Sequence, residues 1–129
     1  MHQVGPMTID EDVARGAQAY AEKLAAADKY LGHSPHNERA GCGENINWNT
    51  DFKALNETTW ATDFWYEKEV DKIDWTDLKF VKGTGHFTQI VWKNSTKLGM
   101  GVAGKYVVGR YKEAGNMQGA FSENVFPKA

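Results

Sequence analysis

The residues that decide the fold are GTGHFTQIVWKN, positions 83–94. Two glycines precede the histidine, and polar and apolar side chains then alternate as they do in a β-strand. We therefore expect a strand over residues 86–93, with His86, Ile90 and Trp92 on one face. His86 begins this strand, and that position suits a functional side chain better than a core one.

The composition predicts one folded domain over residues 1–129. The chain is 41% hydrophobic and contains five tryptophans, which is enough apolar surface for a sizeable core. A formal net charge of -2 gives no basic field, so we expect no nucleic-acid partner. The single cysteine, Cys42, excludes an intrachain disulfide. No apolar run reaches the roughly 18 residues of a membrane-spanning helix, so no transmembrane segment is expected.

Helical patterns come first along the chain and strand patterns later. A capping-box pattern at residues 8–11 opens a helix that runs from about residue 10 to about residue 27. A second long helix is predicted over residues 56–73. Further strands are predicted over residues 98–103 and 105–111, and a tight turn joins them.

One carboxylate in the second predicted helix is a candidate site residue. At about 100° per residue, Glu67 falls between Phe64 and Val70 and close to Trp60, in or beside the apolar stripe. A buried carboxylate needs a partner, because desolvating a lone charge costs several kcal/mol in order of magnitude. Either a structural ion pair with Arg or Lys or a polar cluster with a functional role satisfies this requirement.

A second carboxylate, Glu44, follows two glycines in the segment GCGENI, residues 41–46. The glycines allow a tight backbone path before an apolar residue. From the residues alone, capping of a helix or turn is the simpler interpretation of Glu44.

Three motifs together resemble the CAP superfamily of cysteine-rich secretory, antigen 5 and pathogenesis-related proteins. They are GENI at residues 43–46, GHFTQIVW at residues 85–92, and GN with ENV at residues 115–116 and 123–125. The middle motif is the specific one, and the chain looks most similar to the Golgi-associated plant pathogenesis-related branch. The secreted relatives usually carry a cysteine where this chain has Arg110. The resemblance implies an α+β fold built as a three-layer α-β-α sandwich.

The same resemblance implies a central cleft lined by two histidines and two glutamates. Carried over position by position, these are His33, Glu44, Glu67 and His86. The other histidines, His2 and His36, fall outside this set and are expected at the surface.

The beginning of the chain departs from the family pattern. Relatives begin with an additional helix, whereas this chain starts near the point where that helix ends, so we expect the first helix to be lacking. Its absence would leave one face of the core uncovered, and a homodimer could cover it.

The two histidines, His33 and His86, could offer neutral imidazole nitrogens to Zn²⁺ or another divalent cation. Glu44 and Glu67 would then orient the rings or act as weak ligands beside water. A metal-free cluster of hydrogen-bonded His and Glu residues is the alternative, since no closely spaced His pair preorganises the ligands.

Three functions of different classes remain open at this stage. The resemblance implies a non-catalytic module that binds sterol or lipid, with peripheral membrane contact, and the aromatic residues between Trp60 and Phe80 offer apolar surface for it. A weak hydrolase is the second, although its candidate nucleophiles, Ser34 and Thr50, are poorly placed by sequence. A dimerising interaction scaffold is the third. The resemblance places the protein outside the cell or peripherally at the Golgi membrane.

Overall fold

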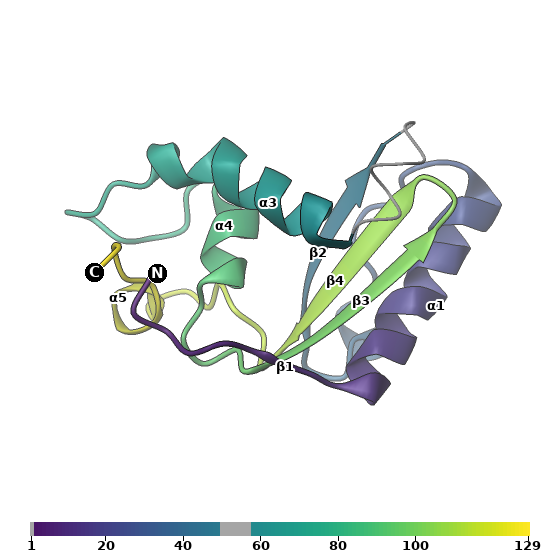
Figure 1. The fold of residues 1–129 in the computed structure, drawn as a ribbon, viewed down its shortest axis with the longest axis horizontal. Coiled ribbons are helices and arrows are strands. Elements are labelled where there is room, and N and C mark those ends of the chain that lie inside the picture. Colours follow the sequence, from purple (N-terminus) through teal and green to yellow (C-terminus); the bar gives the residue numbers. More distant parts are fainter. Residues whose placement is uncertain (1, 50–57) are drawn as a thin grey trace.

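A four-stranded mixed sheet organises the molecule. The computed structural model describes residues 2–49 and 58–129, and within them the strand order is β1-β3-β4-β2. Short β1 runs parallel to β3, and the other neighbours are antiparallel (Figure 1). The bounds are Thr8–Ile9 for β1, Gly43–Trp48 for β2, Lys97–Ala103 for β3 and Tyr106–Lys112 for β4. The two predicted strands of the second half are thus confirmed as the hairpin β3–β4.

Helix α1, Glu11–Ala27, covers one face of the sheet and confirms the first predicted helix. Its N-cap is Asp10, whose carboxylate accepts hydrogen bonds from the backbone N–H groups of Asp12 and Val13 at 2.9 and 3.1 Å. Below it lies a buried cluster of side chains from α1, β2 and β4: Ala17, Tyr20, Ala21, Leu24, Ile46, Tyr106 and Val108.

Two glycines of β3 bring this helix unusually close to the sheet. A Cβ atom on Gly99 would lie 2.2 Å from the backbone nitrogen of Ala14. A Cβ atom on Gly101 would lie 2.4 Å from the backbone of Gln18. Real Cβ atoms do not approach so closely, so only glycine at both positions permits this packing.

The opposite face of the sheet carries α3, Thr58–Glu69, which continues into a short 3₁₀ helix, η2, Val70–Lys72. Ala61 and Trp65 of α3 are buried against Val107 of β4. The predicted second helix is confirmed over its described part, and its predicted start at residue 56 lies outside the described residues. With α1 on one face and α3 on the other, the sheet is the middle of the expected three layers (Figure 1).

The strand predicted over residues 86–93 is wrong. These residues form a short helix, α4, Gly85–Ile90, followed by a turn. Phe87, Ile90 and Val91 also match helical spacing, and a short apolar run fits both periods. Thr88 and Gln89 of α4 can be buried because their side chains have hydrogen-bond partners. Thr88 donates to Asn116 Oδ1 at 2.5 Å, and the Gln89 amide makes hydrogen bonds with the neighbouring loops.

The two ends of the described chain lie together beside α4 (Figure 1). His2 is only 3% exposed, so the expectation of a surface position was wrong for this histidine. One ring nitrogen, Nδ1, lies 2.8 Å from the carbonyl oxygen of Phe126, and the other, Nε2, lies 2.8 Å from the hydroxyl of Tyr66. His36 is exposed, as expected. It begins η1, His36–Glu38, and the last helix is α5, Phe121–Asn124.

Residues 2–10 lead into α1 without a helix, and the regular element among them is the short strand β1. Among the helices that the structure describes, none has the length and apolar character needed to cross a bilayer.

Candidate functional site

The first half of the site is a buried carboxylate that holds a histidine. Strand β2 places the Glu44 side chain under the loop that carries His33 and Ser34, and Glu44 is 7% exposed. Its Oε1 lies 3.0 Å from Nδ1 of His33 and accepts the backbone N–H of Ser34 at 2.9 Å. Its Oε2 accepts the Ser34 hydroxyl at 2.6 Å and Nε–H of Arg110 at 3.1 Å. All of these contacts favour the charged carboxylate.

The charge on Glu44 determines how His33 presents its ring. Burial raises the pKa of Glu44, but the hydrogen bonds from His33, Ser34 and Arg110 outweigh burial and lower that pKa to about 2. An ionised carboxylate only accepts hydrogen bonds, so Nδ1 of His33 must carry the proton. In the neutral ring Nε2 then has a free lone pair. The His33 side chain is 47% exposed, and the residue lines a cavity.

The second half of the site repeats this arrangement with Glu69 and His86. Oε2 of Glu69 lies 2.7 Å from Nδ1 of His86. Oε1 of Glu69 accepts the backbone N–H groups of His86 and Phe87 at 3.0 and 3.2 Å. One carboxylate therefore orients the imidazole and also satisfies the unpaired N–H groups at the start of α4.

The assignment of Glu67 to the cleft was wrong. Glu67 is exposed, whereas Glu69 is 6% exposed and contacts His86. The buried face of α3 follows Ala61, Trp65 and Glu69, which are spaced four residues apart. A helical wheel centred on these residues, rather than on the 38% exposed Phe64, would have selected Glu69.

Two further contacts fix His86. Its ring stacks on Trp65, with ring centroids 5.7 Å apart and planes 3° from parallel. The amide of Asn45 donates to the His86 carbonyl oxygen at 3.2 Å. Sequence reasoning treated Trp65 only as apolar surface, whereas the structure gives it a second role as the platform for this imidazole.

The two histidines meet at one cavity of about 240 Å³. Glu44 lines it too, and the other lining residues are Asn45, Phe80, Gly83, Gly85 and Asn116. Within residues 2–49 and 58–129, neither Nε2 atom of the two histidines has a hydrogen-bond partner. In the same residues, no three or more His, Cys, Asp or Glu side chains are grouped closely enough to enclose a metal ion by themselves.

The serine beside His33 has a structural role. Ser34 is 2% exposed, donates its hydroxyl hydrogen to Glu44 and accepts a hydrogen bond from Nη2 of Arg110 at 3.0 Å. His33 therefore does not act as the base for this hydroxyl in this arrangement. The other hydroxyl considered as a nucleophile, that of Thr50, lies outside the described residues.

The sequence profile of the cysteine-rich secretory protein family, CAP, matches residues 1–111. The chain belongs to the CAP family. Its relatives include the Golgi-associated plant pathogenesis-related protein 1 of Homo sapiens, which is 40% identical over 98% of this chain and 83% of that protein. Protein PRY2 of Saccharomyces cerevisiae is 33% identical over 97% of this chain, which spans 36% of that protein.

Solved structures agree with this assignment. The structure titled "Crystal structure of NaASP2 with Zn2+" superposes with a TM-score of 0.70 at 27% identity, covering 99% of this chain and 70% of that one. The structure of BmVAL-1 gives a TM-score of 0.68 at 28% identity over 87% of this chain and 61% of that one. The α+β sandwich is therefore a CAP fold.

Proposed function

We propose that this CAP domain binds a divalent cation, preferentially Zn²⁺, through Nε2 of His33 and Nε2 of His86, with water completing the coordination. One observation carries the proposal: each imidazole directs Nδ1 at a buried carboxylate, and both rings line the same cavity. In metal sites a ligating histidine commonly donates its other ring N–H to a carboxylate, which fixes the tautomer and raises the basicity of the ligand. Imidazole nitrogen is also a ligand that suits Zn²⁺.

The carboxylates Glu44 and Glu69 support the rings in this proposal and do not bind the ion directly. Their oxygen atoms are occupied by N–H and O–H donors, as the distances above show. The similar CAP structure titled with Zn²⁺ adds support from a relative.

Calorimetric titration with Zn²⁺ tests the proposal. Wild-type protein should release or absorb binding heat that saturates, and His33→Ala/His86→Ala should lose it. His36→Ala is the matched control, because His36 is an exposed histidine that does not line the cavity shared by His33 and His86. Equal heats from the wild type and the double variant would overturn the proposal. Native mass spectrometry, before and after EDTA, reports the same ion together with the mass of the assembly.

A second candidate function is the binding of a sterol or another lipid at the mouth of the cleft. Phe80 is 58% exposed, lines the cavity that contains the histidines, and also lines a neighbouring cavity of about 600 Å³ with Leu78 and Phe121. An exposed aromatic ring between two cavities offers apolar contact to a ligand. Peripheral contact with a membrane, as the name of the Golgi-associated relative suggests, would use the same surface.

Competition with a labelled sterol tests this candidate. Saturable binding at micromolar protein should weaken in Phe80→Ser. Ile9→Ser provides the control, since Ile9 is 71% exposed and lies on β1, outside both cavities. Absence of saturable binding in the wild type would exclude the candidate. A homodimer also stays a prediction, and sedimentation velocity that shows only monomer would contradict it.

A further inference from the structure

Arg110 is a buried cation beside the cleft with several hydrogen-bond partners. It lies on β4 directly opposite Glu44 in the β2–β4 register and is 6% exposed. Its guanidinium donates from Nε to Glu44 Oε2 at 3.1 Å and from Nη2 to the Ser34 hydroxyl at 3.0 Å. A weaker contact of 3.4 Å joins Nη1 to the carbonyl oxygen of Glu38. One planar group thus holds three segments of chain.

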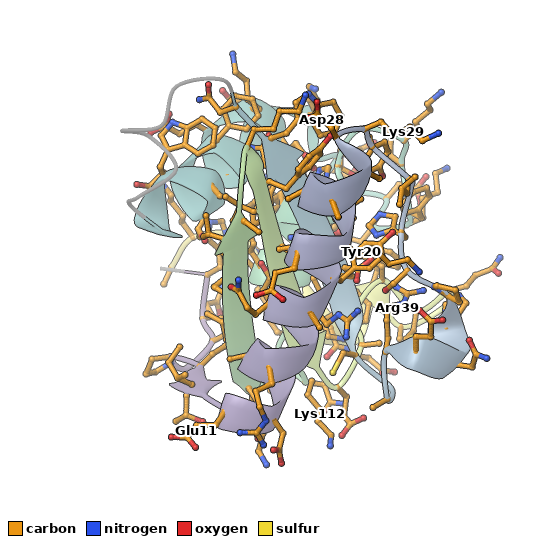
Figure 2. The ribbon with its side chains drawn as sticks, turned by 90° about the vertical axis from the view of Figure 1, so that its right-hand side faces the viewer. Glu11, Tyr20, Asp28, Lys29, Arg39 and Lys112 are labelled. Atoms are coloured by element: carbon orange, nitrogen blue, oxygen red, sulfur yellow. The ribbon has the colours of Figure 1, made fainter. Side chains whose placement is uncertain are left out.

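Helix α1 also contacts the Arg110 guanidinium. The Arg110 guanidinium carbon lies 5.9 Å from the centroid of the Tyr20 ring, in a cation–π contact. The Tyr20 hydroxyl donates to the carbonyl oxygen of Gly32 at 2.5 Å, next to His33. Figure 2 shows Tyr20 projecting from the side of α1 toward the segment that carries Arg39. Gly16 leaves room for the guanidinium, because a Cβ atom there would lie 2.7 Å from Nη1.

We infer that Arg110 is a positioning residue for His33: it sets the orientation of the His33 imidazole by holding Glu44 and Ser34, and it links that orientation to α1. Because the Arg110 Nε–H and the Ser34 hydroxyl both donate to Oε2 of Glu44, Oε1 accepts the hydrogen bond from His33 Nδ1–H, together with the backbone N–H of Ser34. The inference deepens the proposed cation site, on which its functional consequence rests.

The two halves of the cleft therefore differ in what holds them. Glu69 receives its hydrogen bonds from His86 and Phe87, at the start of α4, and makes no ion pair with Lys or Arg within the described residues. Glu44 instead depends on a buried guanidinium. Only an arginine supplies the planar fork that reaches Glu44 and Ser34 together, so lysine at this position would not replace it.

The experiment observes both imidazoles without metal. At about pH 8 an ordinary imidazole is neutral, and the ¹⁵N shifts of its ring nitrogens report which one carries the proton. In Arg110→Lys and Arg110→Met, His33 should lose its predominant Nδ1–H tautomer, while His86 keeps its own in the same molecule. Arg39→Met is the matched control, because Arg39 contacts His36 and not Glu44, and it should leave both rings unchanged.

Gly16→Ala separates positioning from stability. Alanine favours a helix more than glycine, so α1 itself is not weakened, yet the new Cβ would displace Nη1 of Arg110. The Gly16→Ala variant should shift the ¹⁵N signals of the His33 ring in the same direction as Arg110→Lys. It tests the role of Arg110 even if the Arg110 variants fail to fold. An unchanged His33 tautomer in folded Gly16→Ala and Arg110→Lys would overturn the inference, as would equal changes in His33 and His86.

Zn²⁺ titration of the same variants gives the functional consequence. Loss of a residue that orients a metal ligand typically lowers affinity about 10- to 100-fold, and we expect a reduction in that range for Arg110→Lys. A wild type that does not bind Zn²⁺ would overturn the proposed function alone, because the tautomer measurement still tests the role of Arg110.

Discussion

At the scale of single residues, the buried charge of Glu44 predicts a loss of stability in acid. Its pKa is lowered in the folded protein from the ordinary 4.5 to about 2, so its contribution is complete above about pH 4.5 and is lost as pH falls toward 2. A shift of this size corresponds to about 3 kcal/mol. Urea unfolding measured between pH 2 and pH 6 should show this loss in the wild type. In Glu44→Gln the part of the pH dependence due to this residue should be absent, and an unaltered slope would contradict the assignment.

The difference between Glu69 and Glu67 gives a second prediction at this scale. Glu69→Ala removes a carboxylate that accepts three hydrogen bonds, so we expect about 2–3 kcal/mol of destabilisation and weaker Zn²⁺ binding. Glu67→Ala removes an exposed side chain and should change stability by about 0.5 kcal/mol or less. Urea unfolding and calorimetry on both variants provide the measurement. Equal effects from the two would contradict the distinct role assigned to Glu69.

The residues of the cleft were predictable from the sequence to different degrees. His86 was indicated by its position in the segment 83–94, His33 and Glu44 were assigned by motif resemblance, and all three line one cavity. Glu69 was missed because the wheel was centred on side chains at the edge of the buried face. Arg110 stood out in the sequence only because it replaces a cysteine of the secreted relatives. Its contact with Glu44 could not be predicted, because no local pattern indicates which residues of two distant strands lie opposite each other.

At the scale of elements, helices were predicted better than the strand at residues 86–93. The apolar residues of α1 recur at helical spacing over 17 residues, which leaves little ambiguity, although its N-cap is Asp10 and Thr8 of the predicted capping box lies in β1. The six residues of α4 cover less than two turns, and both periods fit them. Tertiary contacts select the helix. The Glu69 carboxylate accepts hydrogen bonds from the N–H groups at the start of α4, and Asn116 donates to the carbonyl oxygen of Gly85 at 2.9 Å.

The close packing of α1 on β3 predicts a severe effect of one methyl group. Gly101→Ala would place Cβ within 2.4 Å of the Gln18 backbone, and backbone atoms cannot turn aside as a side chain can. We expect a loss of about 3 kcal/mol or more, from overpacking and displacement of the helix. Gly5→Ala is the control, because a Cβ atom there has no atom within 4 Å. Thermal unfolding of both variants checks the prediction, which fails if they melt alike.

At the scale of the whole molecule, His2 joins the two ends of the described chain. The ring contacts both the Phe126 carbonyl and the Tyr66 hydroxyl, and it stacks on Trp75 with ring centroids 6.1 Å apart. His2→Ala should cost about 1–3 kcal/mol, because it leaves buried polar groups without a partner. Amide hydrogen exchange should rise around Phe126 and η2 more than in α1. His36→Ala, an exposed change, should alter neither property.

Each imidazole of the cleft is already held in one orientation by a carboxylate that the backbone itself anchors. Little conformational entropy is then left to lose when a ligand arrives, so association should resemble docking onto a rigid surface more than folding around an ion. The far-ultraviolet circular dichroism should stay the same after EDTA treatment, and the heat-capacity change on binding should be small. If the proposed ion binds, such a domain would keep the same shape with and without it, which is the behaviour of a responsive site rather than a structural one.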